Sequence, residues 1–508
     1  MTSVRRGLSS GCGILCLAVW LALVLAATLF PYNFEAVPTG SEVLTMEVYG
    51  FRQLIDVGSN ILLFVPFGAL LAALLRPRGC GLGRTCFLAG FSALLISGTI
   101  EILQQSLPSR EASLLDLLCN ALGAVAGSCA CWKWGAIIAS WSRRFRRGAP
   151  PAVRAGVLAG CCAGLLLLSA VIQYRSRPTN WDDEFVLLIG NEDTGDRPWL
   201  GTVYRVDMSD AALSEQVLRA FAAGEEAELP AGSIAGYEFK DGARFNDRAG
   251  RLPPLVWTGP ENLSTPPGLK LTEDSWLRSS QPPREFARRV RNNGEFSLRV
   301  VCASDNAVQA GPARVLSYSV DLMNRNFTLG QEGPDLVFRL RTPNGGPNGT
   351  RFPLFVPGVF ATSETRDILV SYGGAALRVA VAGSNQVHSV EFSPGPGLAI
   401  AYLPLEPQHF GPLKVIYLGG VFLLLIGMLV WLMPGLISSF VSSLTLLLSF
   451  SFLLEVVLAV AAGRSFDWSS LGVTAIVGFT ALGAVTVPVR YGGAFKVFEP
   501  ILRASRLG

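Results

Sequence analysis

Two pairs of an acid and an amide lie inside apolar stretches of the chain. Asp56 precedes Asn60 by four residues, and Asp116 precedes Asn120 by the same spacing. Residues four apart lie on one face of an α-helix, so each pair presents its carboxylate and its amide together. Charged side chains inside a bilayer usually face the interior of a helix bundle or a water-filled cavity. The spacing therefore predicts two membrane helices with inward polar faces.

A third apolar stretch between these pairs carries Glu101 and Gln104 on one helix face, and Arg110 follows in a short loop. A guanidinium can bind a phosphate or a carboxylate through two parallel hydrogen bonds. Three interpretations are open: a network in which the side chains only satisfy one another, a polar pocket for a head group or substrate, and a proton path. In an enzyme, Glu101 or Asp116 would be the acid/base and Arg110 the anion clamp.

Membrane-spanning helices are expected to position these groups. Half of the 508 residues are hydrophobic and 16% are charged, whereas a soluble protein carries about 25% charged residues. A helix crosses the hydrocarbon core with about 20 apolar residues. About eight stretches approach this length: 11–30, 57–75, 85–107, 114–132, 153–173, 413–433, 436–461 and 470–489. With these spans, all the polar groups approach one level of the bilayer, near its outer face.

Basic residues on short loops set the orientation of a membrane protein. They precede the first stretch, follow the second, separate the fourth from the fifth and follow the last. Eight spans place all four groups in the cytoplasm, together with the N-terminus. Residues 176–410 and the loops at 108–113 and 462–469 then face outward.

Small residues recur at a spacing of four in two of the stretches. Gly123 and Gly127 lie in the fourth, and Gly156, Gly160 and Gly164 lie in the fifth. This spacing lets helices approach closely in lipid. We expect both sets to pack within the protein rather than to form a dimer interface.

Four motifs in order, over about residues 11–135, resemble a VanZ-like membrane domain. They are PYNFE from Pro31, DVGSNILLFVPFG from Asp56, IEILQ from Ile100 and R-x5-D-x3-N-x-x-G from Arg110. The resemblance implies a bacterial integral membrane domain, which we expect in the inner membrane. The founding member is associated with low-level resistance to the glycopeptide antibiotic teicoplanin. The molecular activity of the family is not defined, so the resemblance implies no mechanism.

A degenerate second copy of this pattern is predicted near the C-terminus. Glu455 precedes Arg464 by nine residues, which is the spacing of Glu and Arg in the first copy. Ser470 and Thr474 stand where the first copy has its Asp and Asn. Chance similarity of two hydrophobic hairpins is the alternative. If the repeat is real, this half is a scaffold in which Glu455 pairs with Arg464.

The polar middle, residues 176–410, alternates short β-type runs with Gly, Pro, Asn and Asp, which is typical of an all-β sandwich. IAGYEFKDG (234–242), GEFSLRVV (294–301), NRNFTLGQEG (324–333) and ILVSYGGAALRVAVAG (368–383) resemble a laminin-G/concanavalin A-like jelly roll.

One segment departs from the usual order of that jelly roll. Residues 190–217 resemble the strand and short helix that normally close such a domain, but here they come first. This order implies a circular permutation in which strand 201–207 completes a sheet begun near residue 232. Permutation is tolerated when the termini of a domain lie close together.

Domains of the jelly-roll type often bind sugars, sometimes through Ca²⁺. Asp321, Asn324 and Asn326 offer an oxygen-rich group for Ca²⁺, although such residues more often form turns. No other cofactor or metal is expected. The sequence contains no P-loop, G-x-S-x-G, H-E-x-x-H or paired C-x-x-C motif, and no basic, aromatic-interleaved stretch that indicates nucleic acid.

The predicted chain is multidomain. A VanZ-like transmembrane domain of about five helices occupies residues 1–175, an extracytoplasmic sandwich 176–410 and about three further helices 411–508. We expect a non-catalytic envelope protein that holds a lipid or cell-wall precursor head group at the polar intramembrane side chains and a glycan on the sandwich. The alternatives are an enzyme acting on a lipid-linked envelope substrate and a purely structural polar network.

Overall fold

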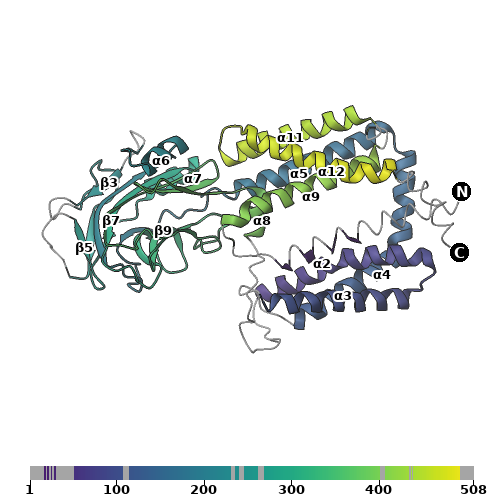
Figure 1. Cartoon of the computed structure of the whole chain (residues 1–508), viewed down its shortest axis with the longest axis horizontal. Helices are drawn as coiled ribbons and strands as arrows, with labels where there is room; N and C mark the ends of the chain where they lie inside the picture. The colour runs from purple at the N-terminus through teal and green to yellow at the C-terminus, as the bar shows by residue number, and fades with distance from the viewer. Residues whose placement is uncertain are drawn as a thin grey trace, which may run out of the picture. The chain divides into compact units, whose positions relative to one another are not determined.

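The computed structural model describes most of the chain, and Figure 1 draws the remainder as a grey trace. The described residues are 17–18, 20–21, 24–25, 28–29, 51–106, 114–229, 235–239, 245–260, 268–400, 405, 407–433, 436 and 439–491. Within these ranges, the side chains of 51–56, 139, 143, 146, 235, 440 and 484–491 are not described. Arg110 and the side chain of Asp56 therefore lie outside the described residues.

Two compact units make up the chain, Met1–Arg154 with Val487–Gly508 and Ala155–Thr486. The helices of the first unit are α2 (Phe51–Leu75), the 3-10 turn η1 (Arg76–Arg78), α3 (Leu82–Gln104) and α4 (Leu114–Gly148). The second unit holds two β-sheets together with α5 (Pro151–Tyr174), α9 (Phe410–Leu432), α11 (Phe440–Ala462) and α12 (Trp468–Tyr491). Most of α5 thus groups with the sheets, not with the helices that precede it.

Six helices in the described part of the chain are long and apolar enough to span a membrane, and they fit a multi-pass membrane protein. They are Val57–Arg78, Leu82–Gln104, Leu114–Ser142, Pro151–Tyr174, Pro407–Leu432 and Val441–Ala462. A shorter apolar helix covers Trp468–Gly483. Most of the first predicted span lies outside the described residues, so the count of eight spans stays a prediction.

Glycine contacts hold α2 against α4. A Cβ on Gly123 would lie 2.2 Å from the carbonyl oxygen of Ile61, and one on Gly127 would lie 2.0 Å from that of Val65. No side chain fits at either position, so the two backbones touch along this seam. The expected internal packing of these two glycines is therefore confirmed.

The glycines of α5 differ from those of α4. A Cβ on Gly156, Gly160 or Gly164 would meet nothing within 4 Å among the described residues. All three positions are exposed in the described structure. Internal packing of this face of α5 therefore stays a prediction.

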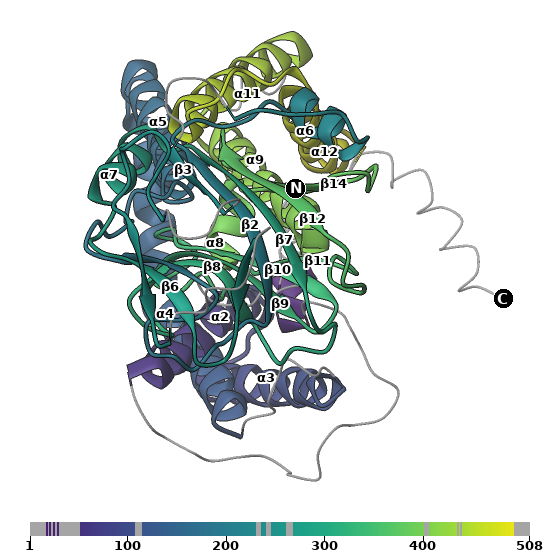
Figure 2. The ribbon, with the colours of Figure 1, turned by 90° about the vertical axis from the view of Figure 1, so that its left-hand side faces the viewer.

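The sheets are antiparallel, with seven strands each, and Figure 2 shows them stacked. The first has the order β11 (Leu354–Val356), β10 (Asp335–Leu340), β9 (Arg325–Glu332), β8 (Ala313–Ser319), β1 (Val186–Ile189), β6 (Trp276–Ser279) and β4 (Leu255–Thr258). The second has the order β14 (Val387–Glu391), β13 (Ala376–Val381), β12 (Arg366–Gly373), β7 (Phe296–Ser304), β2 (Gly201–Ser209) and β3 (Ala235–Glu238), with β5 (Leu269–Leu271) also paired to β2.

The inner faces of the two sheets bury an aromatic core. Phe296 of β7, in the second sheet, stacks on Phe327 of β9 and Phe338 of β10, in the first sheet. Trp181, which is 1% exposed, packs on Phe296, Phe327 and Tyr318. Alternation of apolar and polar residues along the strands produces this core, as predicted for an all-β domain.

Strand β2 pairs with β3 in the second sheet, from Arg205 opposite Glu238 to Met208 opposite Ala235. The predicted pairing of strand 201–207 with a strand near residue 232 is therefore present. The chain returns to the other side of β2 with β7.

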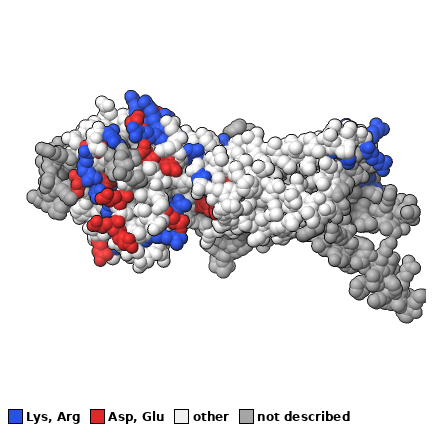
Figure 3. Space-filling view, turned by 90° about the horizontal axis from the view of Figure 1, so that it is seen from above, with Lys and Arg blue, Asp and Glu red and all other residues white. Residues whose placement is uncertain are grey.

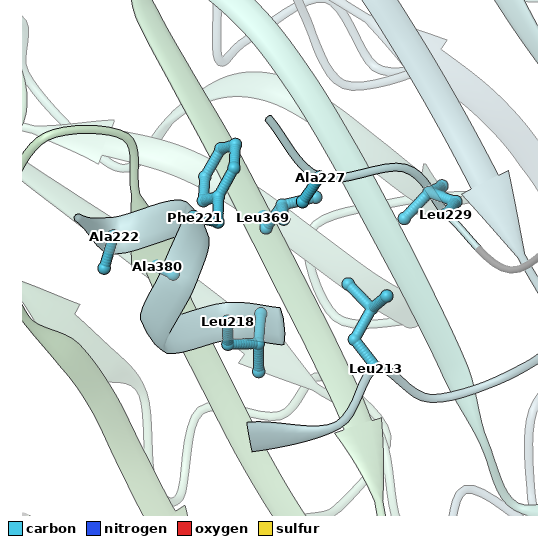
Figure 4. Close-up of a cluster of buried hydrophobic side chains, with 8 residues drawn as sticks. All are labelled: Leu213, Leu218, Phe221, Ala222, Ala227, Leu229, Leu369 and Ala380. Carbon is cyan, nitrogen blue, oxygen red and sulfur yellow. The ribbon is translucent and has the colours of Figure 1, made fainter. Parts of the chain in front are cut away.

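Short helices lie among the strands or come just before the long apolar helix α9. They are α6 (Glu215–Ala222), α7 (Arg284–Asn293), α8 (Pro394–Ala399) and the 3-10 turn η2 (Pro407–His409). Figure 4 shows α6 turning Leu218 and Phe221 onto Leu369 of β12 and Ala380 of β13. Charged side chains concentrate on the sheets in Figure 3, whereas the helices of the second unit show almost none.

Sheet residues cap the end of α5. The Asn344 side-chain amide donates to the Ile172 carbonyl at 3.1 Å, and Gln173 donates to the Phe392 carbonyl at 2.8 Å. Tyr372 Oη donates to the Ser176 carbonyl at 2.6 Å. The Asn344 bond satisfies a carbonyl that the helix end leaves without an intrahelical partner, and the other two bonds join the end of α5 and the residues after it to the sheets. The helices and sheets of the second unit are thus joined by buried hydrogen bonds.

Cys302 provides a test of the packed sheets. Its side chain is 0% exposed in β7, and burial raises the pKa of the thiol to about 12. In a chain whose other cysteines are replaced by alanine, we expect a maleimide to leave Cys302 unlabelled at neutral pH until denaturant opens the sheets, because the thiolate is the reactive form. Ser384→Cys, at an exposed turn, should label at once. Equal labelling rates would contradict this packing.

Candidate functional site

An antiparallel hairpin of α3 and α4 carries most of the described polar groups in the first unit. Its register is fixed by a contact at each end. Cys86 Sγ lies 3.4 Å from Cys129 Sγ, and Asn120 Nδ2 donates to Ser97 Oγ at 2.9 Å. The residues of α3 that follow Ser97 therefore lie beside those of α4 that precede Asn120.

Six polar side chains of this hairpin are buried; Thr85 and Ser128 lie toward one end, and we call the four toward the other end the membrane polar cluster. They are Ser97, Glu101, Gln104 and Asn120, with exposures of 0%, 7%, 8% and 5%. Glu101 lies one turn after Ser97 and Asp116 one turn before Asn120, so the two acids reach the same level of the hairpin. Asp116 is half-buried.

Asn60 on α2 approaches the same region. Its side chain is half-buried, and the next residue, Ile61, touches Gly123, which lies one turn from Asn120 on α4. Both amides therefore lie along one stretch of the α2–α4 seam. The predicted partners Asp56 and Arg110 cannot be placed, because they fall outside the described side chains.

Two hydrogen bonds show how the membrane polar cluster is held. Gln104 Nε2 donates to the carbonyl oxygen of Thr28 at 2.8 Å, which ties α3 to the first apolar stretch. Asn120 uses its amide nitrogen on Ser97, but its Oδ1 atom is buried without a partner among the described residues. An unsatisfied buried acceptor costs about 1–3 kcal/mol, which a donor on a ligand or a water molecule would offset.

The second predicted pair lies between α11 and α12. Arg464 Nη1 donates to Glu455 Oε1 at 2.6 Å, and the backbone N–H of Asp467 donates to the same oxygen at 3.2 Å. The Glu455 side chain is 0% exposed and that of Arg464 is 19% exposed. Glu455 Oε2 is buried and has no partner among the described residues.

The turn between β12 and β13 seats on this pair. A Cβ on Gly374 would lie 2.9 Å from Cβ of Arg464. The adjoining Gly463 lies against the guanidinium of Arg177, which in turn donates to the carbonyl of Asn293. Sheet residues thus cover the loop that carries Arg464.

Buried positions recur at a constant offset of 354 residues between α2–α3–α4 and α9–α11–α12. The matched buried residues include Phe64 and Leu418, Phe67 and Val421, Ala93 and Leu447, Ser97 and Ser451, Ile100 and Leu454, Glu101 and Glu455, Asn120 and Thr474, and Ala124 and Gly478. The similarity extends over three helices without a gap.

One contact between the first and third helices also recurs, but the small residue is on the first helix in one set and on the third helix in the other. In the first set, Gly68 of α2 lies against the backbone of Ala124 of α4. At the corresponding positions, Phe422 of α9 lies against Gly478 of α12, where a Cβ would be 3.0 Å from the ring. A small residue on one helix thus leaves room for the other in both sets.

Ser97 and Ser451 were missed by sequence reasoning. Each lies four residues before its glutamate, so both could have been found by extending the polar helix face by one turn. A serine hydroxyl in an apolar helix is a weak signal by itself, because it can donate to the carbonyl four residues earlier. Ser451 does so, to Leu447 at 2.8 Å.

The buried hairpin and its polar face occur in a part of the chain that resembles known sequences. Residues 14–138 match the VanZ/LLP1 family model. The chain therefore carries a VanZ-like domain, as its motifs indicate. The membrane polar cluster and its half-buried neighbours Asn60 and Asp116 all lie inside this VanZ-like domain. No curated protein and no solved structure matches the chain.

The oxygen-rich group predicted for Ca²⁺ forms local hydrogen bonds. The Asp321 carboxylate accepts the backbone N–H of Met323 and of Asn324, each at 2.7 Å. Asn326 bonds the backbone of Asp182 in both directions. No group of three or more His, Cys, Asp or Glu side chains placed to hold a metal occurs in the described residues.

Proposed function

We propose that the chain is a binding protein of the bacterial envelope, whose VanZ-like domain holds the head group of a lipid or lipid-linked cell-wall precursor. The observation that carries this proposal is the buried Asn120 amide, whose Oδ1 atom has no hydrogen-bond partner in the described part of the chain and which lies one turn from the level of Glu101 and Asp116 in the hairpin. Buried polar groups in a membrane protein usually mark a functional site. A head group with an amine or hydroxyl donor would satisfy the Asn120 Oδ1 atom.

The resemblance to teicoplanin-resistance proteins agrees with a ligand of the cell wall, and we propose resistance as a phenotype on that ground alone. Arg110 and Asp56, which the sequence adds to this set of polar residues, are proposed as further members of the head-group site. No described group is an obvious nucleophile activated by a base, so we favour binding over turnover.

We propose that the sheet domain faces outward. Basic residues gather at the end of α4 and the start of α5, and the positive-inside rule assigns them to the cytoplasm; they are Arg143, Arg144, Arg146, Arg147 and Arg154. The other end of α5 is capped by Asn344 and Tyr372 of the sheet domain. A helix of 24 residues spans about 36 Å at 1.5 Å per residue, enough to cross the bilayer. We propose that α5 crosses the inner membrane, so that the sheets lie on the opposite side of it from these basic residues.

We also propose that α9, α11 and α12 are a degenerate copy of α2, α3 and α4. Three observations support this origin: the constant offset, the contact of Phe422 with Gly478 at the positions that match Gly68 and Ala124, and the buried Glu455. The copy lacks the Asp and Asn of the first set, and its arginine pairs with Glu455 beneath a sheet turn. Its role is to seat the sheet domain, while the first set binds the head group.

The sheet domain is proposed to be a circularly permuted laminin-G/concanavalin A-like jelly roll that binds an extracellular glycan. The order of the segment 190–217 and the pairing of β2 with β3 support the permutation. A Ca²⁺ ion at Asp321 would have to displace the N–H donors that the carboxylate already accepts.

The head-group proposal is tested with Asn120→Leu and Glu101→Gln in the full chain in detergent. We expect binding of a radiolabelled lipid-linked cell-wall precursor to weaken at least tenfold in each, since each removes a polar partner at the proposed pocket. The matched control is Thr99→Val, because Thr99 lies on the exposed face of α3 and bonds only within its helix. Size-exclusion chromatography and the Cys302 assay report folding.

Three other outcomes separate the alternatives. Precursor binding that is equal in wild type, both variants and control means that the cluster is a structural network. Loss of folded protein in both variants, with no precursor bound by wild type, has the same meaning. Conversion of the precursor by wild type but not by Glu101→Gln would favour the enzyme.

A further inference from the structure

Arginine side chains are buried on the outer face of the first sheet. Arg314 of β8 and Arg325 of β9 are each 1% exposed. Arg339 of β10 lies opposite Thr328 in the sheet register and is partly exposed. We call these three residues the arginine cluster. Arginine is almost never fully buried unless it is paired, so two such residues in one sheet require a counter-charge.

The polar residues around the cluster share one face of the sheet. Ser317 bonds Ser319 at 2.8 Å and Thr328 at 3.0 Å, through their hydroxyls. The alternate residues Leu316 and Tyr318 belong to the buried core. The hydroxyls therefore lie on the side of the sheet away from the aromatic core.

The buried carboxylate of Glu192 accepts hydrogen bonds from two residues on this face of the sheet. Arg314 Nε donates to Glu192 Oε2 at 3.0 Å, and the Ser319 hydroxyl donates to Glu192 Oε1. Arg314 also donates to the Pro312 carbonyl at 2.7 Å. Glu192 is thus committed to Arg314, and the other two guanidiniums of the arginine cluster are left without a buried anion among the described residues.

Arg325 carries the unmet donors. Its Nη2 atom donates to the carbonyl of Leu322, whereas Nε and Nη1 are buried with no partner among the described residues. Arg339 Nε is likewise buried and unpartnered in that part of the chain. Asp321 is the other carboxylate near Arg325, but its Oδ1 accepts the backbone N–H groups of Met323 and Asn324 and its Oδ2 accepts the Asn324 side-chain amide.

The charges on this face repel one another. Burial, and next the charge of Arg314, lower the pKa of Arg325 to about 9. Burial and the same neighbour lower the pKa of Arg339 to about 10. Both shifts mean that the positive charge is held at a free-energy cost which a bound anion would remove.

We propose that the arginine cluster binds a phosphate group. Nε and Nη1 of Arg325 and Nε of Arg339 are buried donors without acceptors among the described residues, and phosphate oxygens would accept them. Parallel N–H groups of a guanidinium fit two phosphate oxygens at once. The hydroxyl of Thr328, opposite Arg339, is a further donor beside the cluster.

The position of the site allows two sources of that phosphate. The backbone N–H of Arg325 donates to Pro347 at 3.0 Å, and the same loop caps α5 through Asn344. The start of β9 therefore lies on the side of the sheet domain that meets the helices. Either a free phosphate ester or the head group of an anionic lipid supplies the same oxygens. The site is separate from the membrane polar cluster and does not depend on the proposed head-group function.

Equilibrium dialysis of the full chain in detergent against radiolabelled inorganic phosphate tests the site. We expect saturable binding, at least tenfold weaker in Arg339→Gln and Arg325→Gln. Arg339 is partly exposed, so its variant should fold even if the Arg325 variant does not. Arg219→Gln is the control, since it removes the same charge from an exposed helix position of the same domain. Glu101→Gln should leave phosphate binding unchanged.

A second arm uses nanodiscs of phosphatidylcholine with or without phosphatidic acid. Retention of phosphatidic acid by wild type and not by Arg339→Gln, without binding of inorganic phosphate, supports the site with a lipid source. Binding of inorganic phosphate lost in the variant supports it with a soluble source. Binding of neither probe, or equal binding by Arg339→Gln and Arg219→Gln, would overturn the proposal. Water molecules, and not a phosphate group, would then be the acceptors of the buried donors.

Discussion

Gly127→Leu should prevent α2 from packing on α4. A Cβ at this position would lie 2.0 Å from the carbonyl oxygen of Val65, which is backbone and cannot swing aside. Overpacking of a core costs about 1–3 kcal/mol and more where the backbone must move, so the seam should open. We expect a large fall in the melting temperature of the full chain in detergent and loss of the monodisperse peak in size-exclusion chromatography.

Gly83→Leu is the matched control for this change. Gly83 lies near the start of α3 in the same unit, and a Cβ there meets nothing within 4 Å among the described residues. Leucine has a better helix propensity than glycine by up to about 1 kcal/mol, so the control should be as stable as wild type or slightly more stable. Equal melting temperatures for Gly127→Leu and wild type would mean that the two helices do not touch here.

The second large effect is expected for Arg464→Leu. The change leaves the Glu455 carboxylate buried beneath the sheet turn without its guanidinium. Breaking a buried ion pair by removing one partner costs about 3–5 kcal/mol. The melting temperature of the full chain should fall sharply. Maleimide labelling of Cys302 should become faster if the β12–β13 turn loses its contact with the loop between α11 and α12.

A double variant identifies the cause of that loss. Arg464→Leu with Glu455→Leu should be markedly more stable than Arg464→Leu alone, because the buried charge is gone. Arg219→Leu is the control, since its pair with Glu215 is exposed and worth little. A double variant no more stable than the single one would show that Glu455 is not the charge that Arg464 neutralises.

The parts of the structure that depend on local pattern were accessible from the sequence. Hydropathy located the membrane helices, and spacings of three and four residues placed Glu101 and Asn120 on inward faces, because helix period alone decides which residues share a face. Alternation predicted an all-β middle, in which β2 and β3 share one sheet as expected.

The parts that depend on distant chain segments were not accessible. The burial of Arg314 cannot be inferred from its own strand, because its partner Glu192 is far away in sequence. A register shift between Arg314 and Leu316 further hides the alternation from which that face could be inferred. The grouping of α5 with the sheets likewise rests on bonds from Asn344 and Tyr372, which are far away in sequence.

The bond from Asn344 to the last turn of α5 limits how this protein can be dissected. A fragment that starts after Tyr174 would deprive the Asn344 amide of the Ile172 carbonyl, and a helical fragment that stops there would leave that carbonyl without its side-chain donor. Ligand screens on the excised sheets would therefore sample a damaged edge. Any piece intended to behave natively should retain α5 and its lipid or detergent belt.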